Sequence, residues 1–152
     1  PTSAVAFNGL AEVNLQAGRF TDALAAAHKA AELAPGEWVA LYNLGMIEDR
    51  LSQSQNAIEH LTQALSAGVR DARHRLLIRF YLVRAYARLG DTANAQAELI
   101  TLRKDKSGIS EWTTILASDQ AETLRAVIGQ DVELATQLIS GELDIIALGA
   151  AP

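Results

Sequence analysis

Apolar residues recur at every third or fourth position through most of the chain, in blocks separated by short polar breaks. This spacing places the apolar side chains on one side of a helix, so the pattern predicts a series of amphipathic helices. The blocks end at Gly18, at the Pro35-Gly36 pair and at Gly90, and such residues commonly terminate helices. The predicted helices cover residues 3–17, 20–34, 37–51, 55–67, 71–89 and 92–104.

The pattern repeats along the chain. A shift of 34 residues aligns the first predicted helix pair with the second, and a shift of 38 aligns the second with the third. Alanine and glycine recur where the two helices of a pair would touch, and small side chains there let the backbones approach closely. The aligned residues include Leu10 with Leu44, Ala23 with Ala57, Ala30 with Ala64, Leu44 with Leu82, Ser52 with Gly90, and Ala57 with Ala95.

These recurring residues resemble the tetratricopeptide repeat. The segment from Asn8 to Pro35 follows the pattern of that family closely, Tyr42 to Leu65 follows it again, and Arg88 to Ala95 is a weaker third copy. The resemblance implies an all-α fold, an α-solenoid of stacked helix hairpins. We expect three repeats within residues 1–106, at about 4–37, 38–71 and 76–106.

The chain departs from the family pattern at three positions. Asn14 and Glu48 stand where the pattern usually has a large aromatic residue, which Tyr86 supplies in the third copy. Arg79 replaces a large apolar residue. We therefore expect local changes of packing around these side chains within an unchanged architecture.

Residues 107–152 do not match the repeat and are predicted to form a helical cap. Helices are expected at about 110–118, 119–128 and 131–139, with a break at Gly129 and a short apolar tail at 143–148. The end of a repeat stack needs a cover for its apolar surface. We expect the first of these helices to dock through Trp112 on the apolar residues of the third hairpin's second helix, 92–104, whereas the tail either folds back or marks an attachment point.

The resemblance also implies a binding face, because the first helix of each repeat lines a concave groove in this family. Two interpretations remain for Tyr42, Phe80 and Tyr81, which either face the groove or pack between repeats. One subclass of the family binds the C-terminal carboxylate of chaperones through a set of five conserved side chains. Asn43 is the only one of these five that this chain retains, so membership of that subclass is disfavoured. The predicted partner-binding residues are Asn8, Glu12, Tyr42, Asn43, Met46, Arg50, Tyr81, Arg84 and Arg88.

Charge is distributed unevenly along the chain, whose formal net charge is −5. Residues 71–106 hold eight basic and four acidic residues, whereas residues 107–152 hold one arginine and seven acids. Either the arginines of the third repeat pair with the acidic C-terminal segment or are simply solvated, or they form a basic patch for an acidic partner. The net negative charge argues against nucleic acid as the partner.

No pattern in the sequence indicates catalysis. There is no cysteine, no phosphate-binding glycine loop and no nucleophile elbow, and the three histidines lie far apart, which favours surface or packing roles. We expect Glu48 and Asp49 to be solvated or to face the groove. We predict no cofactor, no metal site and no membrane span.

We therefore expect a protein-binding scaffold or adaptor that holds a protein or peptide and is not an enzyme. The alternative is a regulatory or substrate-recruiting domain of a larger enzyme. Self-association through the groove or the edge, giving a homo-oligomer, is a third interpretation.

Overall fold

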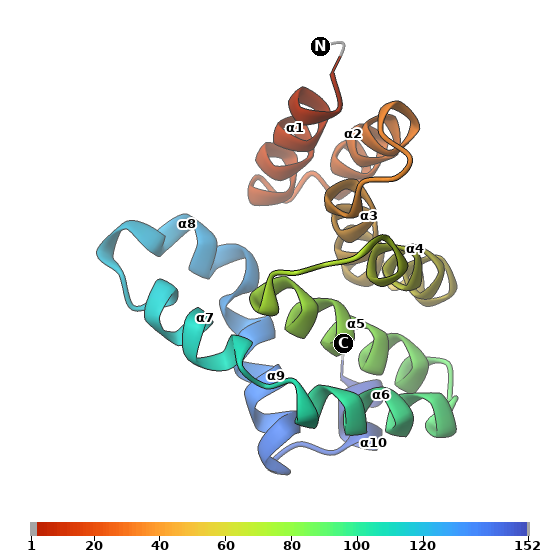
Figure 1. Ribbon diagram of the computed structural model, residues 1–152, viewed down its shortest axis with the longest axis vertical. Coiled ribbons are helices and arrows are strands. Elements are labelled where there is room, and N and C mark those ends of the chain that lie inside the picture. Colours follow the sequence, from red (N-terminus) through yellow and green to blue (C-terminus); the bar gives the residue numbers. More distant parts are fainter. Residues whose placement is uncertain (1–2, 152) are drawn as a thin grey trace. The chain divides into compact units, whose positions relative to one another are not determined.

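The computed structural model describes residues 3–151, and this part of the chain is entirely helical, with no strand (Figure 1). The chain divides after Val69 into two compact units. In the first unit, two consecutive helix pairs pack on each other through α2 and α3. Its helices are α1 (Ala4–Gln16), α2 (Phe20–Leu33), α3 (Trp38–Arg50) and α4 (Ser54–Ala67).

The second unit contains the third hairpin together with all the helices that follow it. The long helix α5 contacts α6, α7, α9 and α10, so it is the centre of this unit. The elements are α5 (Ala72–Arg88), α6 (Thr92–Lys104), α7 (Gly108–Leu116), a 3-10 turn (Asp119–Ala121), α8 (Glu122–Leu124), a π-helical turn (Arg125–Gly129), α9 (Gln130–Ser140) and α10 (Ile145–Ala150). The predicted all-helical fold of consecutive packed pairs is confirmed.

The small residues of the repeat lie at the helix contacts, as predicted. Ala23, Ala57 and Ala95 are each fully buried. A Cβ added to Gly45 would lie 2.3 Å from the side chain of Leu61, so the glycine lets α3 and α4 approach closely. Substitution of these positions by larger residues would force the helices apart.

All three hairpins turn in the same way. The first helix ends at a residue of positive φ, which is Gly18 (72°), Ser52 (55°) or Gly90 (73°). The amide of the next residue then donates to a carbonyl five residues earlier, as in Gln53 N–H to Glu48 O at 2.8 Å. This is the Schellman arrangement, which satisfies carbonyl groups at the end of a helix. Ser52 is the one position of the three where a side chain occupies the left-handed region.

The segment after residue 107 covers the third hairpin, although by a different helix contact from the one expected. Trp112 is 2% exposed, which confirms its predicted burial. However, α7 packs on α5, and α6 contacts α9 and α10 instead. Gly108 permits this docking, because a Cβ there would lie 2.5 Å from the carbonyl oxygen of Ala72.

The two ends of the covering segment also differ from expectation. Gly129 does not separate two helices, because its φ of −56° keeps the backbone helical from the π-helical turn into α9. The apolar tail folds back as α10, with Leu148 1% exposed and Gly149 close to the carbonyl of Ala87 on α5. Ile146 on the same helix remains 79% exposed.

Candidate protein-binding surfaces

In the first unit, α1 and α3 carry the predicted groove residues and contact each other. The side-chain amide of Asn43 donates to the side-chain oxygen of Asn8 over 3.2 Å, which links the two helices. Asn43 is 3% exposed and Asn8 is half-buried. Glu12, one turn further along α1, is exposed, and Val5 is 79% exposed. The accessible part of this predicted face therefore lies on α1.

The remaining predicted residues of the first unit are on α3 and are mostly buried. Tyr42 and Met46 are 6% and 4% exposed, and the tyrosine hydroxyl donates to the sulfur of Met46 over 3.8 Å. The ring of Tyr42 also makes an edge contact with Trp38, at a centroid distance of 6.2 Å. Arg50 is half-buried and pairs with the carboxylate of Asp49 at 3.3 Å. These side chains serve the packing of the unit in this structure.

On α5, the predicted groove residues Tyr81 and Arg84 contact another part of the same chain. Tyr81 is fully buried, and its hydroxyl donates to Asp131 of α9 over 2.6 Å. Arg84 pairs with the other oxygen of the same carboxylate at 3.4 Å, and its guanidinium lies 4.8 Å from the ring centroid of Phe80. Of the two interpretations left open for Tyr42, Phe80 and Tyr81, their burial supports packing inside the protein. On α5 the physical reason is that α9 packs against this helix.

Most arginines of the third hairpin already have acidic or carbonyl partners within their own unit. Arg79 pairs with Glu98 at 3.0 Å, and Arg103 donates to the carbonyls of Leu138 and Ile139 at the end of α9. Arg88, the last residue of α5, is half-buried. Of these arginines, Arg73 and Arg84 pair with acids of the C-terminal segment, so pairing with that segment holds in part, and a basic patch for an acidic partner is unsupported.

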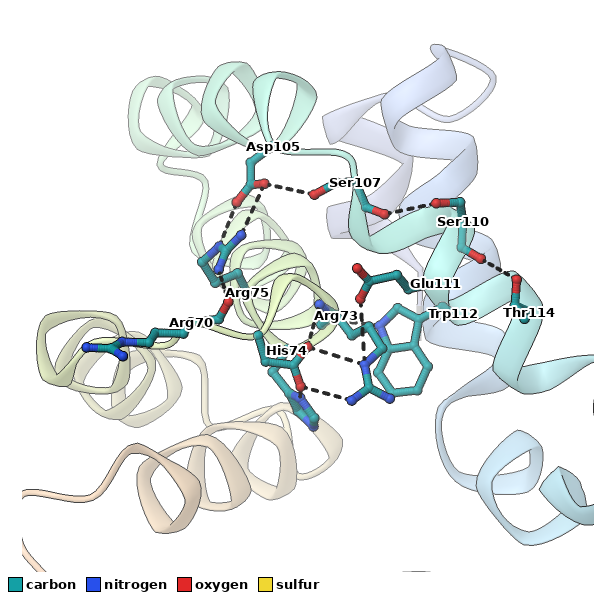
Figure 2. Close-up of polar contacts among 11 residues, drawn as sticks. Arg70, Arg73, His74, Arg75, Asp105, Ser107, Ser110, Glu111, Trp112 and Thr114 are labelled. Atoms are coloured by element: carbon teal, nitrogen blue, oxygen red, sulfur yellow. Dashed lines mark hydrogen bonds and ion pairs between the residues drawn. The ribbon is translucent and has the colours of Figure 1, made fainter.

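Figure 2 shows the densest of these polar clusters, where the start of α5 meets α7. Arg75 extends from α5 to Asp105, at 2.8 Å, and Arg73 reaches Asp71 at 3.2 Å and Glu111 at 3.8 Å. The indole of Trp112 lies under the guanidinium of Arg73, 5.5 Å from ring centroid to carbon, and its N–H donates to the carbonyl of that residue over 2.9 Å. The cluster anchors α7 on α5.

The pKa values of the acids in this cluster are displaced by their partners. Burial raises the pKa of Asp71, but hydrogen bonds from His74 and Arg73 outweigh it, so the net pKa is lowered. The hydrogen bond from Arg75 likewise lowers the pKa of Asp105. Both carboxylates are therefore charged near neutral pH, and Asp71 also accepts from the backbone amide of Arg73 at the start of α5.

A buried acid–histidine pair in the first unit escaped the sequence analysis. Glu48 is 1% exposed and Asp49 is 3% exposed, so the expectation that both are solvated or face the groove is wrong. The carboxylate of Glu48 lies 2.6 Å from the ring of His60 on α4, and that hydrogen bond raises the pKa of the histidine. His28 of α2 makes an edge contact with the same ring at 5.9 Å.

The pair explains one departure from the repeat pattern. Glu48 occupies a position where an aromatic residue is usual, and the hydrogen bond to His60 fills that space with polar groups. Asn14 does the same in the first hairpin, where its side-chain oxygen accepts from Arg19 over 2.8 Å. The signal available in the sequence was a polar residue at an aromatic position, 12 residues before a histidine.

Within residues 3–151, no group of three or more histidine and acidic residues could hold a metal ion. Within the same residues, no helix combines the length and the apolar character needed to cross a bilayer.

Comparison with known proteins gives one match. The family model described as tetratricopeptide repeat matches residues 39–67, which include nearly all of α3 and α4. The comparison with curated proteins found no match, and neither did the comparison with solved structures. Tetratricopeptide repeats are protein-interaction modules. Residues 39–67 are therefore similar to a tetratricopeptide repeat, and the helix pairs before and after this segment close with the same turn.

Proposed function

We propose that the protein is a scaffold or adaptor that binds another protein or a peptide along the α1 face of its first unit and performs no catalysis. The observation that carries this proposal is the exposed stripe on α1. Val5 and Glu12 lie on this stripe two turns apart, and both side chains are exposed. In a repeat of this family, the stripe belongs to the helix that meets the partner.

The internal contacts narrow the location of the partner. On α5, the corresponding side chains of Tyr81 and Arg84 contact Asp131 of α9. On α1, the corresponding side chain of Glu12 is exposed. Asn8 is held by Asn43, which keeps the middle of the α1 stripe fixed for a partner. Since Arg84 is used inside the protein, the chemistry of this face does not favour an acidic partner over other peptides.

Site-specific photocrosslinking in cells tests this proposal. A benzophenone amino acid is placed at Glu12 on the predicted face, or at Lys29 on the exposed surface of α2 as the matched control. We expect one defined protein adduct from position 12 and none from position 29, identified by mass spectrometry. Equal adducts from both positions, or none from position 12, would refute the location.

The crosslinked protein also distinguishes a scaffold from the alternative, which is a substrate-recruiting domain of a larger enzyme. In that case the crosslinked protein would be a substrate of the attached catalytic domain, and its turnover would fall with Glu12→Lys. A scaffold partner would lose binding in that variant without any change in an enzymatic rate.

A further inference from the structure

A second surface lies on the helices that cover the third hairpin. Helices α7 and α9 contact each other, and residues of both line an open groove of about 560 Å³. Its apolar part is formed by Leu116 of α7, by Ala117 directly after that helix, and by Val132 of α9, which is 6% exposed. The groove lies wholly within the second unit.

The hydroxyl groups along the groove present acceptors outward. Thr113 donates its hydroxyl hydrogen to the carbonyl of Ile109 over 2.8 Å, and Thr136 donates to Val132 over 2.8 Å. Ser140 donates to the carbonyl of Gln137 over 3.1 Å. Because each hydrogen is used inside its own helix, the hydroxyl oxygens can only accept further hydrogen bonds.

The charge of the groove is negative as well. Glu133 and Glu142 line it, and no basic residue does. Neither acid forms an ion pair among residues 3–151. The one arginine after residue 107, Arg125, donates to the carbonyls of Leu116 and Ser118 and so closes the end of α7.

The other acids of the segment are used internally. Glu111 pairs with Arg73, Asp131 pairs with Arg84, and Asp144 accepts from the amide of Ala147 at the start of α10. The acids of residues 107–152 that have neither an ion-pair partner nor a capping role carry the remaining negative charge of this segment. Two of them, Glu133 and Glu142, line the groove. A ligand that fits must bring apolar groups, hydrogen-bond donors and positive charge.

We propose that this groove binds a short amphipathic helix of a partner protein, with an apolar stripe flanked by lysine or arginine. Helix α9, of eleven residues, lines the groove along most of its length, so at about 1.5 Å per residue the groove accommodates about three helical turns. The apolar stripe packs on Leu116 and Ala117, and the flanking cations approach Glu133 and Glu142. This surface is independent of the α1 face, so its failure would not affect the proposed function.

Binding is tested on the full chain with synthetic probes. The first probe is a fluorescein-labelled 14-residue peptide that carries leucine at helical spacing and lysine on both edges of that stripe. One control peptide has the same composition in scrambled order, and another has glutamate in place of lysine. In fluorescence anisotropy we expect the first peptide to bind at least about tenfold more tightly than either control. Equal binding of the scrambled peptide, or no binding of the first, overturns the proposal.

Matched charge reversals on the protein locate the site. We expect Glu133→Lys with Glu142→Lys to weaken binding by about tenfold or more, because the cations of the helix then meet cations. Asp119→Lys with Glu122→Lys makes the same change in net charge at exposed residues outside the groove, and we expect less than about a twofold effect. Similar losses in both variants would show that only net charge matters and would overturn the proposal.

A steric variant and a spectroscopic map complete the test. Ala117 is exposed, so Ala117→Trp should fill the groove and abolish binding while the thermal unfolding temperature stays unchanged. Amide chemical shifts in the presence of the peptide should change along α7 and α9. Shifts elsewhere would overturn the proposal, and so would a concentration-dependent dimer of the protein that Ala117→Trp abolishes, because a second copy would then be the occupant.

Discussion

The hydrogen bond between Tyr81 and Asp131 predicts a specific loss of stability in the variant Tyr81→Phe. The substitution removes one oxygen and leaves the fully buried ring in place, so no cavity larger than a hydroxyl is created. The carboxylate of Asp131, 5% exposed, then loses a donor at 2.6 Å and keeps the weaker contact with Arg84 at 3.4 Å.

The magnitude follows from the chemistry of this contact. A hydrogen bond to a charged, buried acceptor contributes about 1.5–3 kcal/mol. For a chain of this length, each kcal/mol lowers the unfolding temperature by about 2–4 °C, so we expect a decrease of about 3–12 °C. Chemical denaturation followed by circular dichroism should give the matching decrease in the free energy of unfolding.

Tyr86→Phe is the matched control on the same helix. Burial raises the pKa of Tyr86, with further contributions from Glu98 and Asp91, but its hydroxyl makes no hydrogen bond among residues 3–151. Removal of this hydroxyl should change stability by less than about 0.5 kcal/mol. If Tyr81→Phe is no more destabilising than Tyr86→Phe, α9 is not held in the groove of α5 by Asp131. A double-mutant cycle with Asp131→Ala should give a coupling energy of about 1 kcal/mol or more.

Four further predictions concern other parts of the fold. Ser52→Gly should raise the free energy of unfolding by about 0.5–1 kcal/mol, because glycine adopts positive φ without the steric cost of a side chain; unchanged stability would show that the turn is unstrained. Trp112→Ala should lower stability by about 3–5 kcal/mol, whereas Trp112→Phe, which keeps a ring, should lower it less in the same denaturation assay. Because the pKa of His60 is raised in the folded protein, its protonation stabilises the fold at pH values below 6.5, the pKa in the unfolded chain. This contribution is lost as the pH rises through the pKa of the folded protein. Glu48→Gln should therefore abolish the difference between denaturation curves at pH 6 and pH 8. A chain cut after Lys106 should expose the apolar face of α5 and aggregate, and a monomeric fragment of unchanged melting temperature in light scattering and calorimetry would contradict the covering role of the segment.

The sequence alone determined the helices and the hairpins, because both depend on interactions between residues close in the chain. The apolar spacing, the turns at Gly18 and Gly90 and the small residues at Ala23 and Ala57 act within one hairpin of about 34 residues. A pattern that repeats at a fixed offset specifies the same local structure each time. It also identified Trp112 as a buried anchor, since a lone large aromatic on an apolar stripe needs a surface to cover it.

Only the tertiary structure decided which helix the C-terminal segment covers and which polar side chains meet. Tyr81 and Asp131 are 50 residues apart, and their contact depends on α9 packing against α5 as well as α6. The exposure of a predicted groove residue likewise depends on what else in the chain packs there. Glu48 and His60 lie closer in sequence, but the pairing uses two helices whose relative rotation fixes which side chains face inward. Composition and periodicity predict that such groups need partners, whereas the three-dimensional packing selects the partner.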